Sequence, residues 1–296
     1  MSGRQRELKR RWKRIRSTRF LPELTGLILS LWTLSPFVLV VFNAAKKSAD
    51  IIINPIAPPT DWGQFFINLK NVIGNQNFSY WNSFGSSLYI TAVSLILLTL
   101  GSSMAAWVLV RNKTKWSQII FMMFVAAMVI PFQVVMLPLL STFRELSSFT
   151  GIPMLSSYTG IVTAYLGFGG SMSVFILHGF IKGIPKELEE AAWIDGCSPE
   201  GTFFQIVLPL LKPVQMTVLI LNGIWIWNDY LLPSLMLGLN GRIKTLPVAV
   251  SSFVGSYVKQ WDLILAAAFL AMIPIVILFF CAQKQIIQGM VEGAIK

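Results

Sequence analysis

Long stretches without any Asp, Glu, Lys or Arg limit how this 296-residue chain can fold. Six such stretches occur, at residues 24–45, 71–110, 116–143, 146–181, 213–228 and 263–283. A helix that crosses a bilayer needs about 20 apolar residues, and a soluble helix of that length would carry charges on its outer face. The stretch 213–228 is long enough only if its helix continues past Asp229 into residues 231–239. We therefore predict an all-α membrane protein with six transmembrane helices.

The positive charges indicate which ends of these helices face the cytoplasm. The chain has 24 Lys and Arg residues and a formal net charge of +11, and nine of the 24 lie within the first 19 residues. Basic residues gather on the cytoplasmic side of membrane proteins. With the N-terminus inside, six spans also place the C-terminus inside, and 17 basic residues then fall in cytoplasmic segments against seven outside. We interpret the basic N-terminal arm as a segment that lies on anionic lipid headgroups, and we expect no nucleic-acid partner.

The predicted organisation is one membrane domain between two short cytoplasmic ends. The basic arm covers residues 1–20, the six-span domain covers 21–284 with a charged cytoplasmic loop at 182–212, and a tail covers 285–296. The spans are expected at about 24–42, 83–110, 116–140, 158–180, 213–239 and 263–281. Between the first two, residues 43–82 should form turns and short helices outside the membrane. The first span is too long for a typical cleaved signal peptide, and we expect it to be retained.

The compositions of the third and fourth spans also predict their shape and packing. Pro131 and Pro138 should kink the third span, and residues 141–157 after it should form a polar outside loop. The fourth span is rich in glycine and serine. Small residues let helices approach each other closely in lipid, so we expect this span to pack at the centre of the bundle.

The loop at 182–212 has the capping residues of two short helices joined at Gly196. Pro185 suits the first position of a helix, and the acidic residues that follow it complement the positive end of the helix dipole. Gly196 stands where this helix should end, because glycine adopts the left-handed conformation at little cost. Ser198 and Pro199 then begin a second helix as its cap and its first residue. The sequence thus predicts a helix, a glycine elbow and a helix.

The second helix of the loop is too apolar to be solvated on all sides. Its apolar residues are Phe203, Phe204, Ile206, Val207, Leu208, Leu210 and Leu211. They must pack either on the transmembrane helices of the same chain or on a partner, and the residues alone favour neither alternative. In the first helix, Ala191 and Ala192 are small enough to let another surface approach the backbone.

The same loop resembles the signature E-A-A-x3-G-x9-I-x-L-P of permease subunits in binding-protein-dependent ABC importers. The matching residues are Glu190, Ala191, Ala192, Gly196, Ile206, Leu208 and Pro209. Both gaps have the length found in that family. The resemblance implies that the elbow is a coupling helix, which sits in a cleft of a separate cytoplasmic ATPase and transmits ATP-driven closure to the membrane helices. Trp193 stands where a basic residue is common in the motif.

Further segments resemble the carbohydrate-uptake branch of these permeases, and within it the shorter permease of maltose-type transporters. They are residues 82–83, 225–233, 245–247, 267–274 and the C-terminal GMVEGAIK. The resemblance implies a heterodimer with a second permease, two ATPase subunits, an extracytoplasmic sugar-binding protein and a sugar or oligosaccharide substrate. It also implies a location in the cytoplasmic membrane of a bacterium or archaeon.

The chain lacks the chemistry of an enzyme. It contains no G-x-x-x-x-G-K-[ST] phosphate loop, so we expect it to bind no cofactor and ATP and Mg²⁺ to be used by the partner ATPase subunits. We predict no catalytic or metal-ligating residues. A proton-coupled transporter would show acids inside its spans or repeated halves, and a membrane enzyme would show clustered His and acids. A single histidine, His178, supplies neither, and we expect it to be a packed residue.

The fifth span has polar residues that are unusual for a lipid-facing helix. They are Asn222, Trp225, Asn228 and Asp229. Polar groups inside a membrane tend to face a cavity, which makes these residues candidates for the translocation path. The alternative is that they form hydrogen bonds between helices and part of an interfacial aromatic belt, and the residues favour this alternative.

Overall fold

The computed structural model describes residues 3–75, 78–239, 241–251, 253 and 260–294. Every regular element among these residues is helical, which confirms the all-α prediction. The elements are α1 (Gly3–Ala44), α2 (Ser48–Ile53), α3 (Gly63–Gly74), α4 (Tyr80–Arg111), α5 (Lys115–Val129), α6 (Phe132–Thr150), α7 (Tyr158–Ile181), α8 (Glu187–Ile194), α9 (Pro199–Thr202), the π-helical turn η1 (Phe203–Val207), α10 (Leu208–Leu210), α11 (Lys212–Asn228), α12 (Leu231–Met236), α13 (Leu246–Ser251) and α14 (Trp261–Ala294).

Three helical segments are long and apolar enough to cross a membrane alone: Leu21–Ala44 of α1, all of α4 and all of α7. Two further candidates are bent pairs. In one, α5 and α6 meet at 111°, and in the other the segment Pro199–Leu210 meets α11 at 74°. The apolar part of α14, Trp261–Ile277, is shorter. The described residues thus contain three candidate spans, or up to five if each bent pair is one span, and the total of six stays a prediction.

The third predicted span, 116–140, bends at Pro131 as expected, but as a break between two helices rather than a kink within one, and Pro138 lies inside the second helix. α5 ends at Val129, and α6 begins at Phe132 in a different direction. Pro131 has extended backbone (φ −64°, ψ 139°), and Ile130 before it is extended as well. The residue before a proline is pushed out of the helical region, and proline has no N–H to continue the ladder. The expected polar loop at 141–157 is also wrong in part, because α6 continues to Thr150.

The fifth span does not continue past Asp229, contrary to the sequence prediction. α11 ends at Asn228, and Asp229 has extended backbone (ψ 124°). Its Oδ1 accepts hydrogen bonds from the backbone N–H groups of Leu231 at 3.0 Å and Leu232 at 3.4 Å. A short acidic side chain that caps free N–H groups in this way begins a new helix, here α12. The apolar residues 231–236 therefore form a separate helix.

α7 lies at the centre of the bundle, as its small residues predict. It contacts α4, α5, α11 and α12. In the most apolar 18-residue window of each span, 56% of the residues are buried in α7, 33% in α4 and none in the window within Leu21–Ala44. At Gly169, a Cβ atom would lie 2.7 Å from Oδ1 of Asn222 and 2.9 Å from a methyl group of Leu98. This glycine is therefore needed for the close packing of α7 on α4 and α11.

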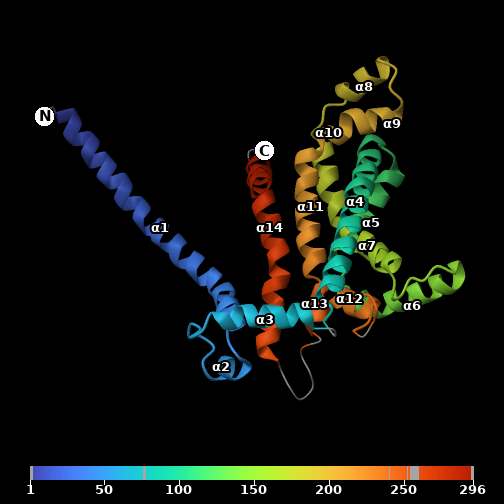
Figure 1. The fold of residues 1–296 in the computed structure, drawn as a ribbon. Helices are drawn as coiled ribbons and strands as arrows, with labels where there is room; N and C mark the ends of the chain where they lie inside the picture. Colours follow the sequence, from blue (N-terminus) through green and yellow to red (C-terminus); the bar gives the residue numbers. More distant parts are fainter. Residues whose placement is uncertain (1–2, 76–77, 240, 252, 254–259, 295–296) are drawn as a thin grey trace.

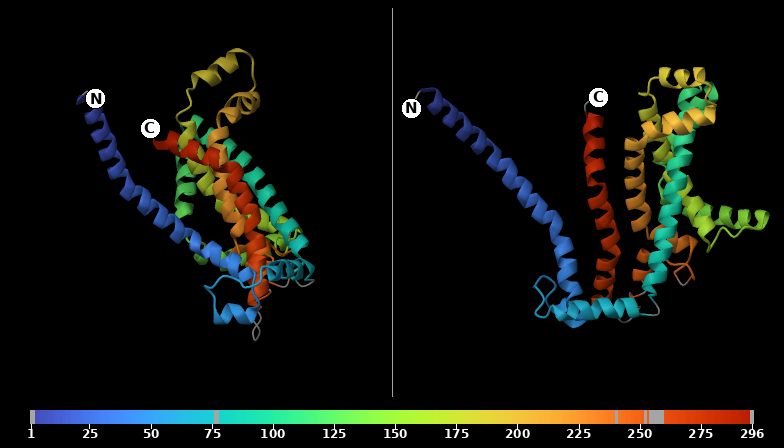
Figure 2. Two further views of the ribbon diagram at one scale, coloured as in Figure 1. Left: turned by 60° about the vertical axis from the view of Figure 1, so that its left-hand side comes forward. Right: turned by 45° about the horizontal axis from the view of Figure 1, so that its top comes forward.

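The two ends of the bundle carry different elements. Both termini and the α8–α9 segment lie toward one end, and α2, α3, α12 and α13 lie toward the other (Figures 1 and 2). α14 runs beside α11, and α1 contacts α14 but diverges from it toward the N-terminus. Residues 21–38 of α1 are exposed on every face of the helix. An apolar helix with no covered face needs lipid or a partner subunit around it.

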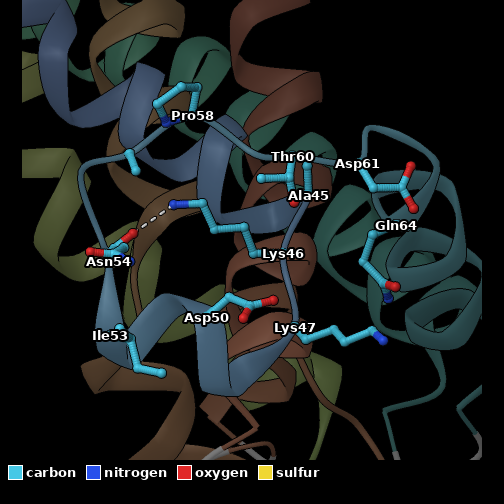
Figure 3. Close-up of a pocket in the computed structure, with 11 residues that line it drawn as sticks. Ala45, Lys46, Lys47, Asp50, Ile53, Asn54, Pro58, Thr60, Asp61 and Gln64 are labelled. Carbon is cyan, nitrogen blue, oxygen red and sulfur yellow. Dashed lines mark hydrogen bonds between the residues drawn. The ribbon is translucent and has the colours of Figure 1, made fainter.

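The segment between α1 and α4 forms turns and short helices, as predicted, and lines a cavity of about 440 Å³ (Figure 3). Lys46 is buried there, and its Nζ donates to Oδ1 of Asn43 at 3.0 Å and to the carbonyl of Asn54 at 2.8 Å. The buried amide of Asn68 on α3 donates to the carbonyls of Ala44 and Lys46. These bonds fix α3 across the end of α1.

Candidate coupling site and polar groups of the bundle

The predicted elbow is present and has the hydrogen bonds of a glycine-terminated helix. Gly196 has φ +85°, in the left-handed region. The N–H of Gly196 donates to the carbonyl of Trp193 at 3.0 Å, and the N–H of Cys197 donates to that of Ala192 at 2.9 Å. This pair of bonds is a Schellman motif, in which two free carbonyls at the helix end are satisfied. α8 begins at Glu187, two residues after the predicted Pro185.

The second helix begins as its capping residues predict. The hydroxyl of Ser198 accepts a hydrogen bond from the N–H of Gly201 at 3.1 Å, and Pro199 is the first residue of α9. The chain then widens into η1, where the N–H of Leu208 donates to the carbonyl of Phe203. Pro209 accounts for this wider turn, because it has no N–H for the carbonyl of Gln205 and its ring needs space beside that carbonyl.

The sequence leaves open whether the apolar side chains of this segment pack on the transmembrane helices of the same chain or on a partner. In the structure some of them pack on the bundle and others stay exposed. Phe203, Val207 and Leu211 are almost fully buried, with 2%, 0% and 0% exposed. They pack in one cluster with residues of α4 and α7: Ala106, Val174, Leu177 and Ile181. One face of the segment therefore folds back onto the bundle. Phe204 and Leu210 remain exposed.

A buried ion pair attaches α8 to the end of α4. Glu189 Oε1 lies 2.6 Å from Arg111 Nη2 and accepts from its Nε at 2.8 Å. The other carboxylate oxygen accepts from the indole N–H of Trp107 at 3.0 Å, and Arg111 also donates to the carbonyl of Ile184. The side chain of Glu189 is 3% exposed. It thus links α8 to the end of α4.

The sequence reasoning missed this role of Glu189. It treated the residue as one of several acids near a helix N-terminus. Arg111 is 78 residues earlier in the chain, and no local pattern connects the two. The available signal is weak: a basic residue at the end of one apolar stretch and an acid just before Glu190, where the motif begins.

The motif residues lie on both sides of the elbow. Ala192 is buried, whereas Glu190, Ala191 and Gly196 are exposed. Ile206 and Leu208 are half-buried, and Pro209 is exposed at the bend into α11. Around the exposed motif residues α8 presents large apolar side chains: Leu188 (45% exposed), Trp193 (52%) and Ile194 (86%). A surface of this kind at the tip of a structure is typical of an interaction site.

The four polar residues predicted for the translocation path do not meet in one place. Asn222 is buried, and its amide donates to the hydroxyl of Ser173 on α7 at 3.0 Å and to the carbonyl of Val218 at 2.9 Å. This contact is the helix-to-helix hydrogen bond of the alternative interpretation. Asn228 is exposed and donates to the carbonyl of Ile224 within its own helix.

Trp225 and Asp229 share a partner on α7. The ring of Trp225 lies edge-on to that of Tyr165, with centroids 5.4 Å apart, and the phenol of Tyr165 donates to Asp229 Oδ2 at 3.1 Å. Trp225 is 41% exposed. Tyr165 thus positions the end of α11, a role that the sequence reasoning did not assign.

His178 is a packed residue. It is buried, and its ring stacks on Phe121 of α5 with centroids 3.7 Å apart and an angle of 17° between the planes. Among the described residues, no group of three or more His, Cys, Asp or Glu side chains is placed to hold a metal ion.

The fold is a bundle of apolar helices with a short helix, a glycine elbow and a second helix at one end. Residues 71–292 match the family of binding-protein-dependent transport system inner membrane components. This match covers most of the chain, and the protein belongs to that family.

Curated relatives are similar over most of their length. The chain is 39% identical over 284 residues to a probable starch degradation products transport system permease, AmyC, of Thermoanaerobacterium thermosulfurigenes, with 96% of this chain and 99% of the relative covered. It is 32% identical to a multiple sugar-binding transport system permease, MsmG, of Streptococcus mutans, with 89% and 92% covered. It is 36% identical to a melibiose/raffinose/stachyose import permease, MelC, of Bacillus subtilis, with 74% and 77% covered.

A solved structure has the same fold. It is the crystal structure of a bacterial ABC transporter involved in the import of the acidic polysaccharide alginate. One of its chains superposes with a TM-score of 0.75 at 19% sequence identity, with 91% of this chain and 97% of that chain covered. At this identity the likeness shows the fold alone.

Proposed function

We propose that this chain is the shorter permease subunit of a heterodimeric ABC importer that moves a sugar or oligosaccharide into the cell. The observation that carries the proposal is the elbow at Gly196. Its Schellman motif, its attachment through Glu189 and its exposed motif residues form a rigid projection at one end of the bundle. The subunit is non-catalytic, and ATP and Mg²⁺ are bound and used by two partner ATPase subunits.

The exposed tip of α8 fits the cleft of an ATPase subunit. Glu190 and Ala191 face outward, with Trp193 and Ile194 beside them. Movement of the tip would pass to α4 through the Glu189–Arg111 pair and to α7 through the buried side chains of η1. The two sides of the elbow therefore have different functions, docking on one and transmission on the other. Transport follows from two states of the paired bundles, biased by ATP and by the loaded binding protein.

We propose six spans in the cytoplasmic membrane of a bacterium or archaeon, with both termini and the elbow inside. Two observations support this orientation. The termini and α8–α9 lie toward the same end of the structure (Figure 1). The basic residues at the ends of α4 and α7, including Arg111, Lys113 and Lys182, lie at that end too, as the positive-inside rule requires.

A sugar substrate and an extracytoplasmic binding protein are supported by the names of the relatives. Those names refer to starch degradation products, to multiple sugars and to melibiose, raffinose and stachyose. A second solved structure similar to the chain, with a TM-score of 0.62, is an alginate ABC transporter in complex with an oligosaccharide-bound periplasmic protein. Trp225, Asn228 and Asp229 stay candidates for the translocation path, whereas Asn222 is better explained by its contact with α7.

Replacement of Gly196 with valine tests the proposed coupling. A β-branched residue is strained at φ +85°, so the elbow of Gly196→Val should change shape. In the purified complex, we expect sugar-stimulated ATP hydrolysis to fall close to the unstimulated rate.

Gly151→Val is the matched control for this substitution. Gly151 also ends a helix in the left-handed conformation, with φ +71°, but it ends α6 rather than α8. It should keep the stimulation. Normal stimulation in Gly196→Val, or equal loss in both variants, would contradict the proposed role of the elbow.

A further inference from the structure

Two hollows lie beside the elbow, and of the residues that line them the proposed docking uses only Glu190. The first has a volume of about 920 Å³ and lies among the α4–α5 turn, the end of α7 and the start of α8. The second, of about 670 Å³, is a shallow, wide-open groove whose lining residues all belong to α5. Both are lined by Lys115, Gln118 and Met122, so they meet at these side chains.

The first cavity is basic. Four lysines line it: Lys113, Lys115, Lys182 and Lys186. They outnumber its two carboxylates, Glu187 and Glu190. Arg111 also lines it, but Glu189 neutralises that charge. In the part of the chain that the structure describes, none of the four lysines forms an ion pair. The cavity therefore has an excess of positive charge and favours an anionic ligand.

The second cavity is apolar. Beyond the shared residues it is lined by Ile119, Met123 and Ala126. Ile119 is 49% exposed and Met123 is 67% exposed, on a helix whose sequence is otherwise apolar. In a membrane this groove faces acyl chains. Flexible methionine side chains suit an irregular apolar ligand.

We propose that these cavities bind one anionic phospholipid. Its phosphate lies among the lysines, and an acyl chain lies in the groove along α5. Charge complementarity supports the headgroup position, and the step from polar to apolar lining matches the structure of a phospholipid. The bound lipid would touch the α4–α5 turn, α7 and α8 together, and so stabilise the base of the elbow. The inference rests on the proposed function only for the assignment of this end to the cytoplasmic leaflet.

Native mass spectrometry of the complex purified from its host membrane tests the site, with phosphatidylglycerol as the probe and phosphatidylcholine as the zwitterionic comparison. Retention of phosphatidylglycerol should exceed that of phosphatidylcholine. Lys113→Gln combined with Lys182→Gln should weaken phosphatidylglycerol binding about thirtyfold, since each lysine near an anionic lipid headgroup contributes to lipid affinity. Lys70→Gln combined with Lys212→Gln removes the same charge outside the cavities and should leave retention unchanged.

Two further experiments test whether the groove holds an acyl chain and whether the bound phosphate belongs to a lipid or is free inorganic phosphate. Met122→Trp should fill the groove and reduce lipid retention, whereas Met128→Trp, on α5 but outside the groove, should not. Inorganic phosphate at millimolar concentration should fail to displace the lipid. Displacement by phosphate alone, equal retention of both lipids, or equal effects of the paired variants would overturn the proposal.

This readout is independent of ATP hydrolysis. It follows lipid bound to this chain whether or not an ATPase co-purifies. Failure of the lipid site is therefore distinguishable from failure of the proposed function. Cross-linking of Lys113 or Lys182 to a protein partner in place of lipid would also overturn the proposal.

Discussion

At the scale of single residues, adjacent acids in the elbow have different roles. Glu189 is buried in an ion pair with Arg111, and Glu190 faces outward. A helix places successive residues about 100° apart, so one side chain points to the bundle and the next points away. Glu190 belongs to the motif, but Glu189, which does not, is the acid that stabilises the elbow.

Glu189→Ala should destabilise the chain strongly. It leaves the guanidinium of Arg111, which is 15% exposed, without its carboxylate. Removing one partner of a buried pair typically costs about 3–5 kcal/mol. The unfolding midpoint of the purified complex, followed by tryptophan fluorescence, should fall clearly. Replacing both partners, as Glu189→Leu with Arg111→Met, should restore most of the lost stability.

Glu190→Ala is the neighbouring control. Because Glu190 is exposed, its loss should change the unfolding midpoint little while it reduces sugar-stimulated ATP hydrolysis. An equal fall in stability for Glu189→Ala and Glu190→Ala would contradict the division of roles.

At the scale of elements, the close packing of α7 depends on particular glycines rather than on glycine content. Gly169→Ala should cost about 1–3 kcal/mol, because the added methyl group meets Asn222 and Leu98 at less than 3 Å. Gly167→Ala, two residues earlier on the same helix, meets nothing within 4 Å and should be neutral or slightly stabilising. Unfolding midpoints of the two variants measure the difference, and equal midpoints would contradict this account of the α7 interface.

The sequence correctly predicts the elements whose signals lie within a few neighbouring residues. Charge-free stretches predict the apolar helices, and the capping preferences of Ser198 and Gly196 predict the elbow with its two helices. The breaks near Pro131 and Asp229 have local signals as well, but their outcome depends on packing. A proline can kink a helix or end it, and an aspartate can lie within a helix end or cap the next helix. Tertiary contacts decide between these outcomes.

The polar contacts between helices are not predictable from local pattern. α4 buries a set of hydroxyl side chains, including Ser86, Ser87 and Ser103, that contact partners on distant elements: Tyr158, the N–H of Leu246 and Gln215. Hydrogen bonds between helices replace water as the partner of such groups in an apolar medium. The sequence reasoning identified the small residues of α7 but not this face of α4.

At the scale of the whole molecule, the structure presents apolar and charged surfaces that one chain alone leaves uncovered. Residues 21–38 of α1 are exposed on all sides, and α8 has apolar side chains at its tip. Lipid and a second permease would cover the first surface, and an ATPase subunit would cover the second. The polar segment around Lys46 (Figure 3) lies at the opposite end from the elbow and would face away from the proposed ATPase.

Cross-linking from the tip of α8 in the assembled complex tests the central claim most directly. Ile194 is 86% exposed on the elbow, and Ile56 is 76% exposed at the opposite end. Each is replaced with cysteine in a chain whose Cys197 and Cys281 are changed to serine, and a photoactivatable cross-linker is attached. Ile194→Cys should form a cross-link with an ATPase subunit that changes on addition of ATP, and Ile56→Cys should form none. A complex in which Ile194→Cys never reaches an ATPase, or in which Ile56→Cys does, would contradict the account.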